Sequence, residues 1–423
     1  MPRLMTFGVL VALCFSALVG SHAQTLNVIY AFSGRDGAYP YAGLTWDEKG
    51  NLYGTTSAGG NTGCSSGQGC GTVFALSASS AGWTYRRIYE FQGQGDGWSP
   101  MARVVFGPDG NLYGTTYYGG QRGKNGYGNG TVFKLTPPAS GNSSSAWTHT
   151  VIYSFAGGPD GATPGVGDLI FDAAGNIYGT TLTGGLVERA CIISPPGCGV
   201  VFELSPSSTG WTEQAIYSFT GGVDGDGPIG GVVFDAKGNL LGTASEGGAS
   251  RPYGTVFELT PSGSSWTETT LHSFSGYADG GYPATSLSLD PGTGIIFGTT
   301  SSSLVDGVGA TVFQITPSSH GYSFQTDYLL PFPSAPLSAL TLRNGNLYGT
   351  TPDGGVGHRA NGNVFELSQT AKGWTGSFYN FSSSNLAPYS PFGGVLVDRN
   401  GVVYGTTQLG GKYSDGTIFE LTP

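Results

Sequence analysis

The sequence is poor in charged residues and in histidine. Of its 423 residues only 10% are charged and 5 are histidine, whereas 75 are glycine. Helical proteins need many Ala, Glu, Lys and Leu residues, so this composition disfavours a helical fold. The shortage of charge does not indicate disorder, because aromatic residues (13%) recur regularly and can form a core. We therefore expect short β-strands joined by tight turns.

Basic residues are also outnumbered by acidic ones, 17 against 27, which gives a formal net charge of −10. An acidic surface repels the phosphate backbone of DNA and RNA. The charge balance therefore argues against a nucleic-acid partner.

Long apolar stretches are absent except at the N-terminus. Arg3 is followed by an apolar stretch from Leu4 to Val19, and Ser21-His22-Ala23 supplies the small residues that a signal peptidase reads. A transmembrane anchor is the alternative, but the stretch is short for a span. We expect residues 1–23 to be a signal peptide cleaved near Ala23. The mature protein, a monomer without a membrane span, is then secreted, periplasmic or at the cell surface.

Four cysteines remain beyond the signal peptide, and they form two close pairs. Cys64 and Cys70 lie in one part of the chain, Cys191 and Cys198 in another. In an exported protein this spacing favours two local disulfides, Cys64–Cys70 and Cys191–Cys198. A zinc site is the alternative, but neither pair has the usual C-x₂-C spacing with a nearby histidine.

A heptapeptide, Gly-Asn-Leu-Tyr-Gly-Thr-Thr, organises the chain. It first occurs at residues 50–56 and returns at 110–116, 175–181 and 345–351, with weaker copies at 238–244, 294–300 and 401–407. Its tyrosine position recurs every 51–65 residues. Each copy follows a short apolar stretch and precedes a Gly-Thr-Val-Phe segment and then a segment ending near Tyr-x-Phe. The repeat therefore consists of four short antiparallel strands.

Repeats of four strands predict an all-β fold, a seven-bladed β-propeller over residues 24–423. The mature chain begins with a lone fourth strand, Leu26 to Phe32, and ends with a third strand, Thr417 to Leu421. We expect the N-terminal strand to complete the last blade, which joins the ends of the ring and removes an exposed edge.

The repeats resemble those of the GloVer tandem-repeat family, a group of exported bacterial repeat proteins. The resemblance rests on G-N-L-Y-G-T-T, then G-G, then G-T-V-F-E-L, and it covers nearly the whole mature chain. It implies a repeat scaffold at the cell exterior and assigns no catalytic residue.

The most regular polar motif is Asp-Gly-x-x-Pro, between the fourth strand of one blade and the first strand of the next. It supplies five aspartates: Asp36, Asp96, Asp160, Asp224 and Asp279. A ring of carboxylates could hold a cation such as Ca²⁺. Local turn chemistry, with Asp accepting backbone hydrogen bonds, is the simpler explanation and the one we favour. No cofactor is expected.

The remaining candidates break the repeat on the face that carries the variable loops. Trp98 and the pair Tyr117-Tyr118 are aromatic residues that can stack on sugar rings, although core packing explains them equally well. The loops that follow the heptapeptide add four further candidates: Arg122, Arg189, His358 and Arg359.

No set of residues in the sequence has the arrangement of a catalytic site. We expect an exported, non-catalytic binding or structural propeller that recognises an extracellular glycan or a surface protein. The alternative is a carbohydrate-active enzyme, either a polysaccharide lyase or a glycoside hydrolase, with its site at the channel mouth. A purely structural surface protein is a third possibility.

Overall fold

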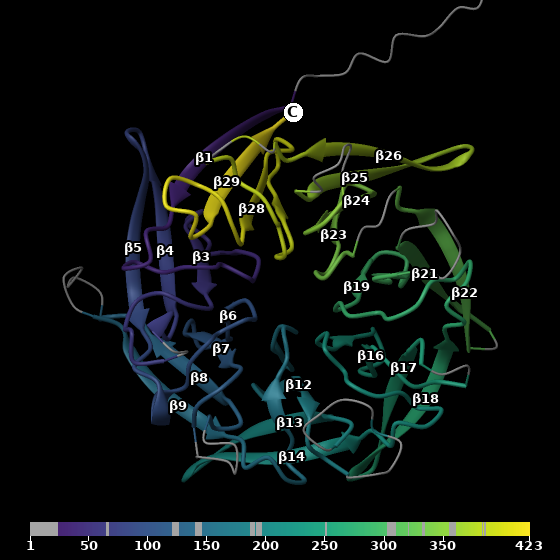
Figure 1. Ribbon diagram of the computed structural model, residues 1–423. Coiled ribbons are helices and arrows are strands. Elements are labelled where there is room, and N and C mark those ends of the chain that lie inside the picture. The colour runs from purple at the N-terminus through teal and green to yellow at the C-terminus, as the bar shows by residue number, and fades with distance from the viewer. Residues whose placement is uncertain are drawn as a thin grey trace, which may run out of the picture.

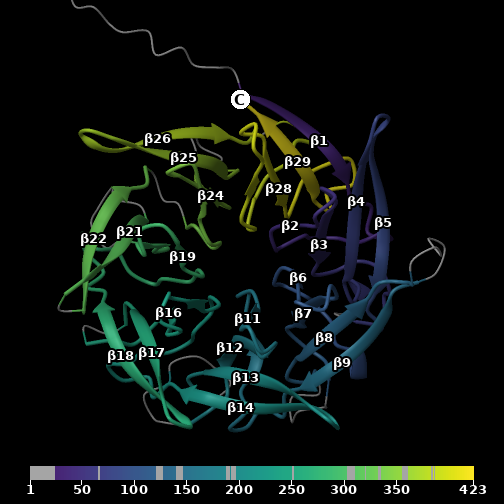
Figure 2. The same ribbon diagram turned by 180° about the vertical axis from the view of Figure 1, so that it is seen from behind.

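The computed structural model describes residues 24–423 apart from 65–66, 121–126, 140–145, 187–190, 192–196, 250–251, 303–309, 320, 332–334, 355–360, 383 and 385. Seven antiparallel sheets stand like blades around a central axis (Figure 1), and the view from behind shows the same closed ring (Figure 2). The predicted seven-bladed β-propeller is therefore confirmed.

In blades 1–6 the strands follow the order of the sequence from the axis outward. Blade 1 comprises β2 (Thr45–Trp46), β3 (Leu52–Thr56), β4 (Thr72–Ser79) and β5 (Gly82–Glu90). Blade 2 comprises β6 (Val105–Phe106), β7 (Leu112–Thr116), β8 (Thr131–Thr136) and β9 (Thr148–Ser154), and the short 3₁₀ helix η2 (Gln94–Asp96) precedes it. Blade 3 comprises β10 (Ala162–Pro164), β11 (Ile170–Phe171), β12 (Ile177–Thr183), β13 (Val200–Ser207) and β14 (Gly210–Ser218).

The other blades follow the same plan. Blade 4 comprises β15 (Val233–Phe234), β16 (Leu240–Ala244), β17 (Thr255–Ser262) and β18 (Ser265–Ser273). Blade 5 comprises β19 (Ser288–Leu289), β20 (Ile296–Thr299), β21 (Thr311–Ser318) and β22 (Gly321–Leu329). Blade 6 comprises β23 (Thr341–Arg343), β24 (Asn346–Thr351), β25 (Asn363–Thr370) and β26 (Gly373–Asn380).

Blade 7 joins the two ends of the described chain. It comprises β27 (Leu396–Val397), β28 (Val403–Thr407), β29 (Thr417–Thr422) and, as its fourth strand, β1 (Thr25–Ala31). Strands β1 and β29 pair antiparallel, with Leu26 opposite Leu421 and Val28 opposite Phe419. The expected closure is therefore confirmed, and β29 is paired on both sides instead of being left as an edge strand.

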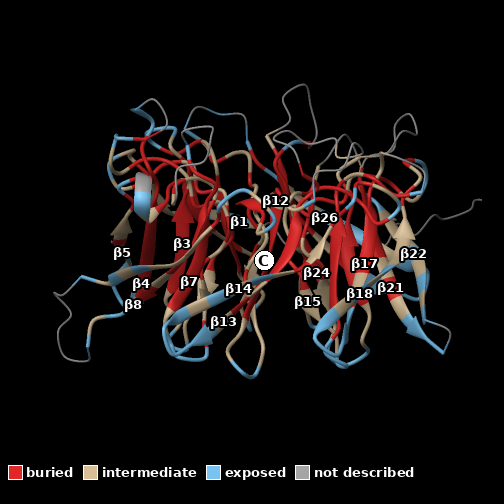
Figure 3. Cartoon of the chain, turned by 90° about the horizontal axis from the view of Figure 1, so that it is seen from below, coloured by how far each residue is buried: buried red, intermediate tan, exposed pale blue. Residues whose placement is uncertain are grey.

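The core lies between neighbouring blades. In Figure 3 the middle strands are buried, whereas the hairpins that join third and fourth strands are exposed at one face. The five residues of β3 are all buried, because the sheet packs against a blade on each side. Phenylalanines of the third and fourth strands, such as Phe74 and Phe91, are fully buried.

The first half of the heptapeptide forms a turn. Gly50 has a φ of +81°, a left-handed conformation that favours glycine. The backbone N–H of Asn51 donates to Asp47 Oδ1 at 2.8 Å, and its side chain donates to Asp47 Oδ2 at 2.6 Å. The Tyr53 hydroxyl also donates to Asp47, at 3.2 Å. The Asp at the end of the first strand is therefore a turn residue.

The second half of the heptapeptide holds the blades together. A Cβ atom on Gly54 would lie 2.5 Å from the ring of Phe74, so only glycine leaves room for that ring. Thr55 donates to the carbonyl of Ala102, in the next blade, at 3.1 Å. Thr56 bonds to the hydroxyl of Thr72 on the neighbouring strand at 2.8 Å. The motif is conserved along the chain because each residue has a packing or hydrogen-bonding role in the scaffold.

Aromatic residues at the start of the fourth strands seal the gaps between blades. Trp147, for example, packs edge-on against Tyr53 of the preceding blade, with ring centroids 6.1 Å apart. Five other fourth strands place Trp83, Trp211, Trp266, Tyr322 and Trp374 at this position. These aromatic side chains therefore belong to the core between blades.

Blade 7 departs from this rule. The register of β1 puts Gln24 where the other blades have an aromatic ring. Gln24 there lines a pocket of about 350 Å³ with Tyr348, Val403 and Leu421, between blades 6 and 7. We call this pocket the seam slot.

Both predicted disulfides are present. Cys64 and Cys70 have Cα atoms 4.9 Å apart, and those of Cys191 and Cys198 are 5.0 Å apart. Disulfides of this kind are typical of oxidising, extracellular environments. Within the described residues, no helix is long and apolar enough to span a membrane.

Candidate functional site

Seven short segments line the axis of the propeller just before the first strand of each blade. They follow the proline that ends each fourth-to-first loop, and we call them the inner segments: residues 40–44, 100–104, 164–169, 228–232, 283–287, 336–340 and 391–395. Together they enclose a pocket of about 560 Å³, open solvent included. Because the inner segments begin at the fourth-to-first loops, the pocket lies toward the face that carries these loops and the second-to-third loops. We call it the loop face.

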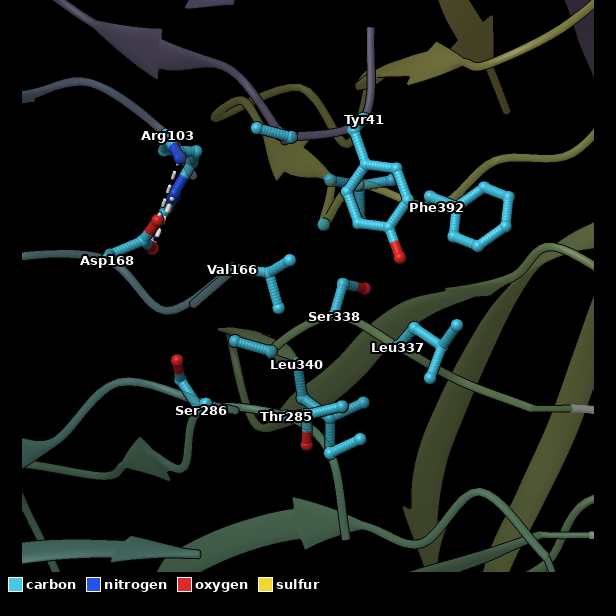
Figure 4. Close-up of a pocket in the computed structure, with 18 of the residues that line it drawn as sticks. Tyr41, Arg103, Val166, Asp168, Thr285, Ser286, Leu337, Ser338, Leu340 and Phe392 are labelled. Carbon is cyan, nitrogen blue, oxygen red and sulfur yellow. Dashed lines mark hydrogen bonds and ion pairs between the residues drawn. The ribbon is translucent and has the colours of Figure 1, made fainter. Parts of the chain in front are cut away.

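An aromatic pair forms one wall of the pocket. Tyr41 from blade 1 and Phe392 from blade 7 stack with ring centroids 4.6 Å apart and planes 28° apart. Figure 4 shows the two rings side by side, with the Tyr41 hydroxyl directed into the pocket. Burial, and to a lesser extent the nearby Tyr117 hydroxyl, raises the pKa of Tyr41 to about 12. Tyr41 is therefore a neutral hydrogen-bond donor at any physiological pH.

An ion pair forms the opposite wall. The guanidinium of Arg103 donates from Nε to Asp168 Oδ2 at 2.8 Å and from Nη2 to the same oxygen, and the Arg103 backbone N–H donates to Oδ1 at 3.2 Å. The Asp168 charge raises the pKa of Arg103 further. A third of the Arg103 side chain (33%) and 18% of the Asp168 side chain are exposed. Both residues therefore offer hydrogen-bonding atoms to a molecule in the pocket (Figure 4).

Arg103 is specific to blade 2. It is the third residue after the proline of its inner segment, where five other blades have a small residue: Gly43, Gly231, Ser286, Ala339 and Gly394. Blade 3 has one extra residue in its inner segment, which brings Asp168 opposite Arg103. A small residue at this position keeps the channel open, whereas Arg103 and Asp168 place charge in it. The pair therefore breaks the symmetry of the repeats inside the channel.

Sequence reasoning missed Tyr41, Phe392, Arg103 and Asp168. They lie in segments that belong to the regular repeat, whereas the candidates predicted from the sequence lie in the variable loops. A comparison of the inner segments position by position identifies Arg103 at once, because it is the one large polar residue among glycine, alanine and serine. The partner, Asp168, is harder to find, because the extra residue in blade 3 shifts its position.

The structure describes three of the seven predicted ligand-contact residues. Trp98 is only 8% exposed and belongs to the core between blades 1 and 2, so little of its ring can reach a ligand. Tyr117 and Tyr118 are half-buried on the loop face, with ring centroids 4.7 Å apart. The other four candidates, Arg122, Arg189, His358 and Arg359, lie outside the described residues.

The aspartates of the Asp-Gly-x-x-Pro motif serve their own turns. Asp160, for example, accepts the Ala156 backbone N–H at 2.6 Å and the Tyr153 hydroxyl at 3.0 Å. The same two kinds of contact involve Asp36, Asp96, Asp224 and Asp279, with His272 of blade 4 replacing a tyrosine at Asp279. In the part of the chain that is described, no three His, Cys, Asp or Glu side chains are grouped to hold a metal ion. Each of the five aspartates therefore stabilises the turn in which it lies.

The family of the chain follows from its repeats. The profile of the Gloeobacter/Verrucomicrobia repeat family matches residues 18–194 and again residues 190–419. The protein belongs to this family, and the resemblance seen in the sequence is confirmed. A search of curated proteins returns no match.

Solved structures with the same fold have diverse activities. A fungal alcohol oxidase of the AA5 family in complex with copper is 12% identical, with a TM-score of 0.54 over 94% of this chain and 76% of its own. The GH74 enzyme of Niastella koreensis is 14% identical, with a TM-score of 0.54 over 93% of this chain and 53% of its own. A putative 6-phosphogluconolactonase from Bacteroides fragilis is 14% identical, with a TM-score of 0.52 over 86% of this chain and 88% of its own. At such identities the likeness shows the propeller fold alone.

Proposed function

We propose that this protein is an exported, non-catalytic binding module that holds an extracellular glycan at the mouth of its channel. The observation that carries the proposal is the pairing of an aromatic wall, Tyr41 with Phe392, and a polar wall, Arg103 with Asp168, in one pocket. A sugar has an apolar face of C–H groups and an edge of hydroxyls. The aromatic wall fits the face, and the ion pair supplies both donors and acceptors to the hydroxyls.

The charge of the pocket favours a neutral sugar. Arg103 and Asp168 are the two charged residues among its described lining, and they compensate each other. Since the protein as a whole carries a formal charge of −10, it has no surplus of positive charge to attract an acidic polymer. Polar groups that are already paired, yet partly exposed, are suited to bind hydroxyl groups at low desolvation cost.

The same lining supports binding rather than hydrolysis. Glycoside hydrolases place two carboxyl groups on either side of the scissile bond, roughly 5–10 Å apart. Asp168 is the one carboxylate among the described residues that line this pocket, and its Oδ2 already accepts two guanidinium hydrogen bonds. The enzyme alternative therefore needs a second acid that the described lining does not provide.

The proposal is tested by glycan-array binding of the mature protein and of three variants. Tyr41→Ala removes half of the aromatic wall, and Arg103→Gly installs the residue that blades 1, 4 and 7 use at this position. Lys237→Ala, in an exposed turn of blade 4 on the opposite face, is the matched control. We expect the wild type and the control to bind the same glycan and both channel variants to bind it at least about tenfold more weakly, which is a loss of about 1.4 kcal/mol.

Three results of the glycan experiments would overturn the proposal. They are the absence of any glycan binding, glycan binding that neither channel variant weakens, and release of new sugar ends from the bound glycan by the wild type. The last result would establish the enzyme alternative. Binding of a surface protein without any glycan would also overturn it.

A further inference from the structure

A row of aromatic side chains connects the rim of blade 2 with the channel mouth. We call Tyr127, Tyr118, Tyr117, Tyr41 and Phe392 the aromatic row. Ring centroids are 6.0 Å apart between Tyr127 and Tyr118, 4.7 Å between Tyr118 and Tyr117, and 4.6 Å between Tyr41 and Phe392. The Tyr117 hydroxyl, in turn, is close enough to Tyr41 to contribute to its raised pKa. The row thus starts on the loop face of blade 2 and ends inside the pocket.

Part of the row is held rigid from below. Trp98 stacks on Tyr118 with ring centroids 4.4 Å apart and planes 24° apart. The backbones of these two residues exchange hydrogen bonds of 3.0 and 3.1 Å, and Trp98 Nε1 donates to the Tyr127 carbonyl at 3.4 Å. Trp98 is therefore the support of the row rather than its surface. A platform fixed in advance loses little conformational entropy when a ligand binds.

The aromatic pair below the row is specific to blade 2. The backbone pairing of Trp98 with Tyr118 has counterparts in five other blades, and none of these joins two aromatic residues: Ala38 with Ala58, Ala162 with Thr183, Asp226 with Glu246, Gly281 with Ser302, and Tyr389 with Leu409. Arg103 is also specific to blade 2. Two independent departures from the repeat thus occur in blade 2. The aromatic row leads from the first, the Trp98–Tyr118 pair, into the pocket that contains the second, Arg103.

We propose that the aromatic row is a series of sugar-binding subsites, so that the ligand is a linear polysaccharide whose end enters the channel and whose chain lies across blade 2. This inference rests on the proposed function and specifies its ligand class. Exposure of the row supports it, since Tyr127 is 62% exposed at the rim and the four residues nearer the axis are half-buried. A single sugar needs only the pocket, whereas a row leading out of the pocket is of use to a chain. Each sugar that stacks on a ring should raise affinity by roughly three- to tenfold.

The test is a chain-length series. Isothermal titration of the mature protein with di-, tetra- and hexasaccharides from cellulose, xylan and chitin measures affinity against length. We expect at least one series to rise by more than about tenfold from disaccharide to hexasaccharide. Tyr127→Ser should flatten that rise and leave disaccharide affinity unchanged, because Tyr127 is far from the pocket. Tyr118→Ala should flatten it further.

The matched control is Tyr277→Ser. Tyr277 is 59% exposed in the fourth-to-first loop of blade 5, on the same face but outside the row, so its replacement should leave the whole series unchanged. A wild-type series that binds but does not rise with length overturns the row and leaves the channel-mouth site intact. A rise that Tyr127→Ser and Tyr118→Ala do not reduce also overturns the row. Failure of all the oligosaccharides to bind overturns both this inference and the proposed function.

Discussion

Replacement of Glu213 by glutamine should stabilise the protein at alkaline pH and have little effect at acidic pH. Glu213 lies on β14 of blade 3 and packs against blade 2. Its Oε2 accepts the Tyr153 hydroxyl at 3.5 Å, whereas Oε1 is buried without a hydrogen-bond partner. Burial, and then the nearby negative charge of Asp160, raises the pKa of Glu213 from 4.5 to about 7.

The raised pKa of Glu213 determines how its carboxyl changes the stability of the fold with pH. A carboxyl whose pKa is higher in the folded than in the unfolded protein favours folding when it is protonated. Well below pH 4.5 the Glu213 carboxyl is protonated in both the folded and the unfolded protein and does not affect stability. Between pH 4.5 and about 7 the free energy of unfolding falls as pH rises. Above about pH 7 the carboxyl is ionised in both states and the full destabilisation is present. The full shift corresponds to at most about 3 kcal/mol, and partial solvent exposure of the carboxylate reduces this to about 1–2 kcal/mol.

Glutamine has the same shape and no charge, so Glu213→Gln should remove this penalty. The assay is denaturant unfolding of the variant and the wild type at about pH 5 and about pH 8, since the difference between the two proteins cancels the pH response of every other group. We expect the variant to be about 1–2 kcal/mol more stable at the higher pH and within a few tenths of a kcal/mol at the lower one. Glu48→Gln, in an exposed turn, should change neither value. An equal stability difference at both pH values would show that the Glu213 carboxyl is not destabilised by its surroundings.

Two further predictions concern the scaffold. Gly54→Ala should lower the free energy of unfolding by about 2–3 kcal/mol, because its Cβ would lie 2.5 Å from the Phe74 ring. Gly95→Ala is the control and should be nearly neutral, because no atom lies within 4 Å of its Cβ. Equal denaturation midpoints for the two variants would contradict the packing role of glycine in the heptapeptide. Gln24→Trp should fill the seam slot and raise the thermal midpoint of the protein. The reverse change in blade 6, Trp374→Gln, should lower the midpoint by opening an equivalent gap beside Phe297. A Gln24→Trp protein that melts at a lower temperature than the wild type would show that the slot does not accept an indole ring.

The architecture could be derived from the sequence because every blade solves the same packing problem. Gly54 must be small to admit the Phe74 ring, Thr55 must reach the next blade, and Asp47 must accept the Asn51 N–H. The glycine requirement recurs in all seven blades and the aspartate requirement in most of them, and the strand order follows from the residues that recur. The closing strand was equally predictable, since Leu26 to Phe32 has the pattern of a fourth strand and no other partner in its own repeat.

The candidate site was less accessible to the same reasoning. Trp98 stands out in the sequence as an aromatic residue in a variable loop, yet it is buried, because it supports Tyr118 instead of facing solvent. Its neighbours Tyr117 and Tyr118 were recognised, but their relation to Tyr41 was not. That relation depends on the closed ring, which brings inner segments from blades 1, 2, 3 and 7 around one pocket. Sequence spacing alone does not contain this geometry.

In a symmetric ring, a functional site has to be built by breaking the repeat, and a position whose carbonyl accepts no hydrogen bond from a neighbouring blade is better suited to this than one whose carbonyl does. The second residue after each inner proline is not such a place, because its carbonyl accepts the threonine hydroxyl of the preceding blade, as Ala42 and Ala102 do. Among the described residues, the carbonyl of the third residue accepts no threonine hydroxyl in this way and the residue lines the channel, although a Cβ atom on Gly43 would lie 2.6 Å from the Gly394 carbonyl oxygen. Arg103 occupies that position, and its partner Asp168 lies in the one inner segment with an extra residue. This channel-lining position is therefore the one at which the protein carries charge, and this is why we place ligand binding there.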